Sequence, residues 1–240
     1  MELPEPTARA LDEFLAVART SLGGDLSSAV LFGSAAEGAL RPESDVNLVL
    51  VLKALPEKGF EDMRGALRLA RAAARLEVMF LLEGEIAAAT EAFAVKFADI
   101  SRRRRVLFGS DPFAELKVPE DALRRRLSQT LLNLVLRLRE AWALHGGNDD
   151  EAARSVSNFA GPLRAAAASL LSLEGRGVPS PKEALRQAAA DLPGDGWPAL
   201  VESLSAVREQ RPLSHGEAAR ILGRLPALAA LLRERARRVP

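Results

Sequence analysis

The sequence has no cysteine and no tyrosine, only two histidines, and an aromatic content of 5%. Without cysteine the chain has no disulfides, no thiolate metal sites and no cysteine nucleophile. Neither His145 nor His215 has another metal-ligating residue at a useful spacing, which argues against a histidine-based metal centre. The scarcity of aromatic rings argues against binding of single-stranded nucleic acid by base stacking.

The sequence also lacks an excess of charge of either sign and a long apolar run. A formal net charge of +1 over 240 residues argues against a protein that holds nucleic acid mainly through its phosphates, so we expect no nucleic-acid partner. No apolar run approaches the roughly 20 residues that cross a bilayer. The first residues do not have the basic and then apolar order of a secretory signal. We therefore expect a cytoplasmic protein without a membrane partner.

The first half of the sequence alternates between segments typical of strands and of helices. This order predicts an α+β domain, with a mixed β-sheet and flanking helices, over residues 1–110. The segment 97–108 fits neither pattern well, and the turn residues at 109–112 mark the expected domain boundary. Strands are predicted at 28–32, 46–52 and 76–82, and helices at 7–22, 57–75 and 83–95.

The second half, residues 111–240, has helical periodicity throughout. Leucines recur every three or four residues from Leu123 to Leu138, which predicts a long amphipathic helix that ends near Gly146. Further helices are predicted at 149–173, 181–191, 197–209 and 214–238. The expected architecture of this half is an all-α helical bundle of about four or five helices.

A glycine-serine pair follows the first predicted strand, and the next strand begins with the sequence Ser44-Asp45-Val46-Asn47. A strand that ends in Gly33-Ser34 lets the backbone approach phosphate oxygens, and the serine hydroxyl and nearby amides can donate to them. Positions 45 and 47 are two apart on a strand, so their side chains project to the same side. Two carboxylates there would hold magnesium ions that bind a nucleoside triphosphate.

Position 47, however, is an asparagine. An amide oxygen can coordinate magnesium, but it carries no negative charge and does not bridge two cations as a carboxylate does. We therefore expect at least one metal ion to bind weakly.

Glu77 interrupts the apolar strand predicted at 76–82. A carboxylate is costly to bury unless it faces a polar cleft, which makes Glu77 a candidate for the same site. The alternative is a glutamate that faces solvent on an edge strand. In the sequence, Arg75 is the only cation expected beside it.

The motif from Gly33-Ser34 to Gly38, followed by Ser44-Asp45-Val46-Asn47, resembles the polymerase-beta-like nucleotidyltransferase superfamily. It is most similar to the aminoglycoside (streptomycin-type) adenylyltransferases, and residues 97–113 are similar to uncharacterised nucleotidyltransferase-like proteins. The resemblance implies a nucleotidyltransferase fold with Mg²⁺ and a nucleoside triphosphate, most simply ATP. It assigns phosphate binding to Gly33, Ser34, Gly38 and Ser44, and metal binding and catalysis to Asp45, Asn47 and Glu77. Glu77 would bind metal or act as general base toward the acceptor.

Two functions remain open. One is magnesium-dependent transfer of a nucleoside monophosphate to an unknown small-molecule or protein acceptor. The other, favoured by Asn47, is a catalytically silent protein that binds a nucleotide or a protein partner. A third, an RNA-modifying enzyme, would need a basic channel that the sequence does not show. A homodimer is compatible with the sequence.

Two arginine clusters, at 102–105 and 124–126, have two interpretations. They could contact a triphosphate or an RNA backbone, because guanidinium groups bind phosphate in a bidentate manner. They could equally be solvated faces of the protein.

Overall fold

A computed structural model describes residues 3–38, 40, 44–177, 180–211 and 213–239. The chain divides into two compact units, Met1–Val118 and Pro119–Pro240. The first unit contains the candidate site, and each unit is described by itself.

The first unit contains a four-stranded mixed sheet with the strand order β3-β2-β1-β4. The central strand β1 is antiparallel to both β2 and β4, whereas β2 and β3 run parallel. The strands are β1 Leu26–Phe32, β2 Val46–Leu52, β3 Leu76–Leu82 and β4 Arg104–Gly109. The helices are α1 Glu5–Leu22, α2 Glu57–Ala74, α3 Ile86–Ala92 and α4 Ala94–Arg102, with short 3-10 turns at Gly23–Asp25, Gly33–Ala35 and Glu83–Glu85.

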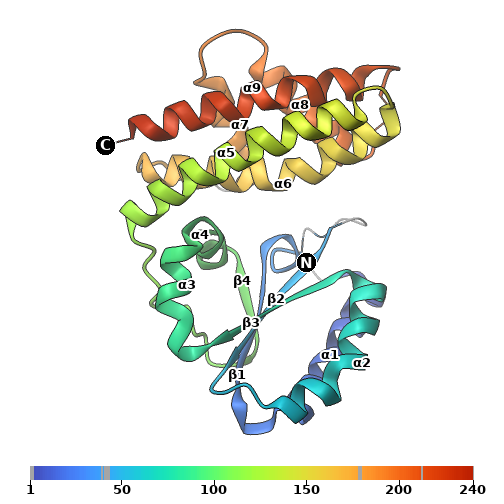
Figure 1. Cartoon of the computed structure of the whole chain (residues 1–240), viewed down its shortest axis with the longest axis vertical. Coiled ribbons are helices and arrows are strands. Elements are labelled where there is room, and N and C mark those ends of the chain that lie inside the picture. Colours follow the sequence, from blue (N-terminus) through green and yellow to red (C-terminus); the bar gives the residue numbers. More distant parts are fainter. Residues whose placement is uncertain (1–2, 39, 41–43, 178–179, 212, 240) are drawn as a thin grey trace. The chain divides into compact units, whose positions relative to one another are not determined.

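Helices cover both faces of this sheet, α1 and α2 on one side and α3 and α4 on the other (Figure 1). Beneath α1 and α2, Phe14 and Met63 belong to the same buried cluster as Leu48. On the opposite face, Phe97 of α4 and Phe113 are fully buried, with their ring centroids 5.9 Å apart. Phe113 lies beyond the turn at 109–112, so the chain continues to pack on the sheet after that turn.

The structure differs from the sequence expectation in two places. The predicted helix at 83–95 is a 3-10 turn followed by two helices, which meet at Phe93, where φ is −119° and ψ is 40°. The ambiguous segment at 97–108 contains the end of α4 and the fourth strand, β4. This strand begins with two arginines, and its residues are half-buried or exposed. It is an edge strand, and its sequence lacks the long apolar run that is typical of a central strand.

The second unit is all-helical, as predicted. It consists of α5 Glu120–His145, α6 Asp149–Leu173, α7 Pro181–Ala190, α8 Trp197–Arg208 and α9 Glu217–Arg238. The predicted fold class, a mixed sheet with flanking helices followed by helices, is confirmed. In the described parts of the chain, no helix has an apolar stretch long enough to cross a bilayer.

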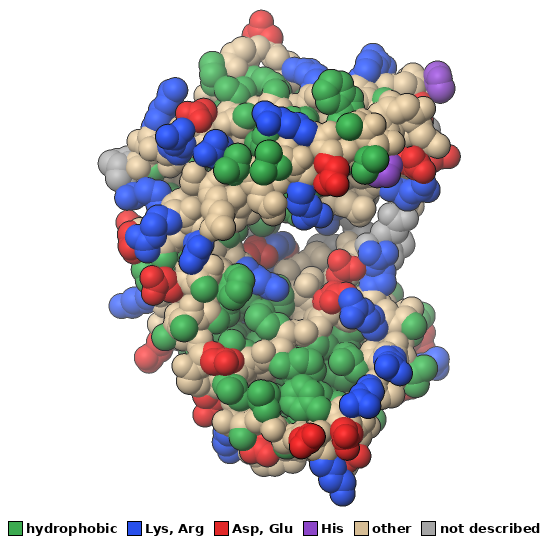
Figure 2. All heavy atoms as spheres, in the orientation of Figure 1, with side chains coloured by type: hydrophobic (Ala, Val, Ile, Leu, Met, Phe, Trp, Pro, Cys, Tyr) green, Lys and Arg blue, Asp and Glu red, His purple; other side chains and the backbone are tan. Residues whose placement is uncertain are grey.

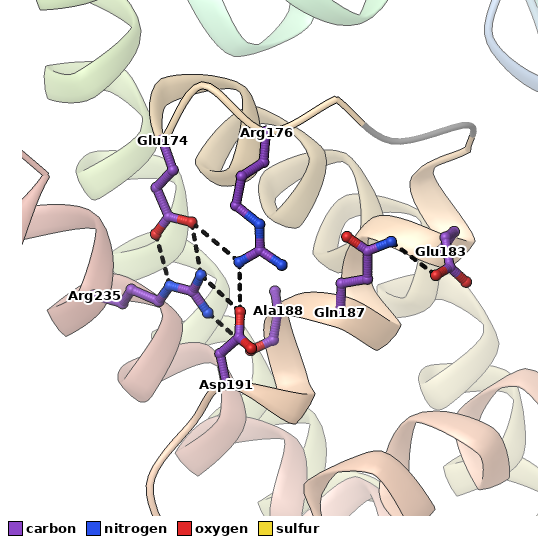
Figure 3. Close-up of polar contacts among 7 residues, drawn as sticks. All are labelled: Glu174, Arg176, Glu183, Gln187, Ala188, Asp191 and Arg235. Carbon is purple, nitrogen blue, oxygen red and sulfur yellow. Dashed lines mark hydrogen bonds and ion pairs between the residues drawn. The ribbon is translucent and has the colours of Figure 1, made fainter.

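Arg235 joins three helices of the second unit (Figure 3). Its guanidinium makes two hydrogen bonds, of 2.7 and 2.6 Å, with the carboxylate of Glu174, which directly follows α6. It also lies 3.1 Å from Asp191, which directly follows α7. Hydrogen bonding to Glu174 is the main cause of a raised pKa at Arg235. Arg176 contacts the same two carboxylates, so the four side chains form one network.

We expect Arg235→Met to lower the free energy of unfolding of the second unit by about 2 kcal/mol, because it removes charge-assisted hydrogen bonds from a side chain that is only 19% exposed. Arg237→Met is the matched control, since Arg237 is 58% exposed and, among the described residues, forms an ion pair with Glu234 alone, on the same helix, at 3.4 Å. Thermal unfolding followed by circular dichroism measures both variants. Equal melting temperatures would contradict the structural role of Arg235.

Candidate active site

The pairing of three strands brings the predicted site residues to one end of the sheet. Asn47 lies opposite Phe32 of β1 on one side and opposite Glu77 of β3 on the other. Gly33 follows Phe32 directly, and a methyl group placed on Gly33 would lie 3.9 Å from Asn47 Nδ2. Side chains at alternate positions of β2 share a face, and Val49 packs in the same cluster as Phe32. Gly33, Asn47 and Glu77 therefore border one continuous surface.

The glycine-serine turn is shaped by its two glycines. Gly33 has φ +73° and Gly38 has φ +65°, in the left-handed region that favours glycine. The Gly33 amide donates to the Arg103 carbonyl at 3.0 Å, and the Gly38 amide donates to the Ala35 carbonyl at 3.2 Å. Both glycine amides thus donate to other residues of the protein. The two glycines contribute to the site through the backbone conformation that they allow.

Ser34 is a residue of this turn whose donors are available to an anion. It is half-buried at the start of the 3-10 turn, where a backbone amide has no acceptor within the turn. Its amide and its hydroxyl make no hydrogen bond with another residue in the described ranges. Ser44, also half-buried, directly precedes Asp45; residues 41–43 lie outside the described residues.

Arg103 fastens the glycine-serine turn to α4. Its carbonyl oxygen accepts a hydrogen bond from the Gly33 amide. Its side chain donates hydrogen bonds to Glu37 at 3.0 Å and to the two carboxylate oxygens of Asp99 at 2.9 and 2.5 Å. Burial lowers the pKa of Arg103, but the hydrogen bonds and charges of Asp99 and Glu37 outweigh burial and raise it. The side chain is 17% exposed, so Arg103 has an internal, positioning role.

This finding corrects the solvated-face interpretation for two of the four arginines at 102–105. Arg103 and Arg104 are paired with carboxylates and largely buried, whereas Arg102 and Arg105 are exposed. Arg104 bonds to Asp111 at 2.9 Å, and its side chain is only 18% exposed. In the second cluster, Arg125 and Arg126 bond to Asp121 and Gln129 on their own helix.

We expect Arg103→Gln to destabilise the first unit by about 2 kcal/mol, because the largely buried Asp99 carboxylate loses both hydrogen bonds from Arg103 and keeps only the 3.8 Å contact with Arg102. Arg105→Gln is the control: Arg105 is exposed on β4, two residues further along the chain, and has no hydrogen bond or ion pair with a described residue. Chemical denaturation followed by far-ultraviolet circular dichroism measures the free energy of unfolding of both variants. If the two variants unfold alike, Arg103 does not hold the turn in place.

Each carboxylate of the site is paired with an arginine. Asp45 Oδ1 lies 3.0 Å from Arg75 Nε, and Glu77 Oε1 lies 2.7 Å from Arg71 Nη2. The expectation that Arg75 would be the only cation beside Glu77 is therefore wrong. Arg75 ends α2 in the left-handed conformation, with φ +51°, and its side chain reaches Asp45, while Arg71 comes to Glu77 from the last turn of α2.

The two carboxylates are exposed enough to exchange their arginine partners for other cations. The side chains of Asp45 and Glu77 are 50% and 48% exposed, and those of their arginines are more exposed still. Exposed pairs of this kind contribute about 0–1 kcal/mol. Glu77 does lie on an edge strand, as the alternative interpretation held, but it also borders the surface at Asn47.

Asp45, Asn47 and Glu77 are the residues of this surface that could hold a divalent cation. Among the residues that the structure describes, no group of three or more histidine, cysteine, aspartate or glutamate side chains is placed to hold a metal ion. The Asn47 amide donates to the Asp45 carbonyl at 3.4 Å, which leaves the oxygen Oδ1 as its ligand atom. Magnesium commonly keeps several waters and takes one or two carboxylates together with substrate phosphates. Two carboxylates and one amide oxygen therefore offer enough protein ligands for one magnesium ion and too few for two.

Lys96 is a residue of this surface that sequence reasoning missed. Its Nζ lies 5.7 Å from the centroid of the Phe32 ring, at the end of β1. Burial lowers the pKa of Lys96, and the negative charge of Glu77 acts in the opposite direction. The available signal was a single lysine in the otherwise apolar segment 92–98.

An apolar groove of about 520 Å³ lies at the other end of β3. It is lined by Leu55, Glu57, Phe60, Phe80, Leu82 and Glu85. On the face of the molecule shown in Figure 2, basic and acidic side chains are interspersed, and no basic channel is visible there. The residues that line this groove do not include Asn47 or its neighbours at the glycine-serine turn.

The comparisons with known proteins agree with this architecture. The structure is similar to the crystal structure of spectinomycin adenyltransferase AAD(9) from Enterococcus faecialis with ATP and spectinomycin, with a TM-score of 0.63 and 13% sequence identity. That likeness covers 93% of this chain and 99% of the other. No protein-family model matches the sequence.

A curated protein of Methanocaldococcus jannaschii, named "Putative protein adenylyltransferase", is 46% identical over 48 residues. The match covers 20% of this chain and spans about a third (33%) of the archaeal protein. Together, these likenesses agree with the resemblance noted in the sequence, and the structural likeness shows that the chain has the fold of that spectinomycin adenyltransferase.

Proposed function

We propose that this protein is a nucleotidyltransferase, which moves a nucleoside monophosphate from a triphosphate, ATP, onto a small-molecule or protein acceptor. The observation that carries the proposal is the strand register, which sets Asn47 opposite Glu77 and beside the turn at Gly33. The names of the two similar proteins both describe adenylyl transfer, which supports ATP as the nucleotide.

The glycine-serine turn would bind the phosphates. Ser34 offers an amide and a hydroxyl, and the left-handed conformations of Gly33 and Gly38 let the backbone approach the ligand closely. Ser44, which precedes Asp45, would add a second hydroxyl. These donors are neutral, so the charge of the triphosphate has to be balanced by cations.

Asp45, Asn47 and Glu77 would hold one Mg²⁺ ion. Binding would exchange the exposed contacts with Arg75 and Arg71 for contacts with the metal. When bound, the metal would neutralise phosphate charge and withdraw electrons from the reacting phosphorus.

Glu77 would also serve as the general base. Its carboxylate would accept the proton of the acceptor hydroxyl as the hydroxyl oxygen forms a bond to the α-phosphorus. The bond from that phosphorus to the bridging oxygen breaks, and pyrophosphate leaves. Most of the rate enhancement would come from positioning and charge neutralisation.

The second candidate function is a catalytically silent protein that binds a nucleotide or a protein partner. Asn47 and the arginine partners of Asp45 and Glu77 favour it, because both reduce the negative charge available to metal ions. Transfer of label from the α-phosphate of ATP separates the two functions.

We expect Mg²⁺-dependent incorporation of α-phosphate label into an acceptor pool that includes the protein itself, and a loss of about 100-fold or more in the rate of incorporation in Glu77→Gln. Glu61→Gln, an exposed glutamate on α2, is the control and should keep full activity. ATP binding with no transfer to any acceptor would favour the silent protein. Failure of ATP with Mg²⁺ to raise the melting temperature would count against the enzyme and against a silent protein that binds ATP.

Asn47→Asp gives a second test. If this variant creates or strongly raises activity, the natural protein is better described as silent. If it changes only the preference among divalent cations, the enzyme function stands.

A further inference from the structure

The Lys96 ammonium is directed at the end of β1, where the glycine-serine turn begins. Its Nζ lies over the ring of Phe32, 5.7 Å from the centroid, and Phe32 is both the residue before Gly33 and the strand partner of Asn47. Helix α4 fixes this placement, because the neighbouring Phe97 is fully buried in the same cluster as Phe32. Lys96 has no hydrogen bond or ion pair with any residue that the structure describes.

The charges around Asn47 leave Lys96 as a cation without an equal and opposite partner. Asp45 is paired with Arg75, and Glu77 is paired with Arg71, so each carboxylate is already balanced. Asn47 adds no charge at the position where a carboxylate would attract a second metal ion. Among these five side chains, the positive charges of Lys96, Arg71 and Arg75 exceed the negative charges of the two carboxylates by one, which favours a phosphate over a second Mg²⁺.

We propose that Lys96 binds the triphosphate directly and supplies the positive charge that a second metal ion cannot bring to a site with Asn47. This inference rests on the proposed function. A lysine suits the role because its ammonium is a compact charge with three donors on a flexible stem. The Glu77 charge acts on the Lys96 pKa, which agrees with the two side chains bordering the same surface.

The role of Lys96 is tested by ATP affinity, measured by titration calorimetry in the presence of Mg²⁺. We expect Lys96→Met to bind ATP at least about tenfold more weakly, a difference of about 1.4 kcal/mol, and Lys96→Arg to stay near the natural affinity. Lys58→Met is the matched control, since Lys58 is exposed on α2 and should bind as the natural protein does. Circular dichroism melting of each variant verifies that it is folded.

The outcomes separate this inference from the proposed function. If the natural protein binds ATP and folded Lys96→Met binds it equally well, the role of Lys96 is refuted and the proposed function stands. If the natural protein does not bind ATP at any Mg²⁺ concentration, the proposed function fails and the inference fails with it.

A double variant tests the idea of charge replacement itself. Asn47→Asp adds a carboxylate that can bring a second metal ion, so Asn47→Asp with Lys96→Met should regain ATP affinity as the Mg²⁺ concentration rises. Lys96→Met alone should regain much less over the same range. Equal Mg²⁺ dependence of the single and double variants would show that the lysine does not stand in for a metal ion.

Discussion

The register of β2 between its two neighbours is the constraint on which the candidate site depends. Leu48 and Leu50 are completely buried beneath α1 and α2, and Val49 is completely buried on the opposite face, so both faces of the strand are fixed by packing. A slip of one residue would move Asn47 to the wrong face and put Leu48 opposite Glu77. Packing of the hydrophobic core thereby places the polar side chain of Asn47 at one end of an otherwise apolar strand.

This constraint has an electrostatic consequence. Parallel pairing of β2 with β3 brings Asp45 and Glu77 close to the end of α2, whose arginines, Arg75 and Arg71, take one carboxylate each. In the proposed function, a site of this kind would hold one metal ion, and Lys96 would supply a further positive charge. The same pairing is compatible with both candidate functions, because the arginines would compete with a metal ion for the two carboxylates without occupying the glycine-serine turn.

The sequence was sufficient for the parts of this account that depend on local pattern. Apolar runs rich in valine and leucine predicted β2 and β3, and the glycine-serine turn with Asp45 and Asn47 predicted the fold, which the structure confirms. The strand β4 was not predicted, because an edge strand that starts with arginines has no apolar pattern. Lys96 and Arg103 act across elements far apart in the sequence, and only the tertiary structure reveals their neighbours.

The most direct test of the account is to locate ATP on the protein by titrating it, with Mg²⁺, into isotope-labelled protein and following the backbone amide signals by nuclear magnetic resonance. If the turn and the paired strands form one phosphate-binding surface, the largest shifts will be at Ser34, Asn47 and Glu77. Shifts confined to residues elsewhere, with these three signals unmoved at saturation, would contradict the central claim.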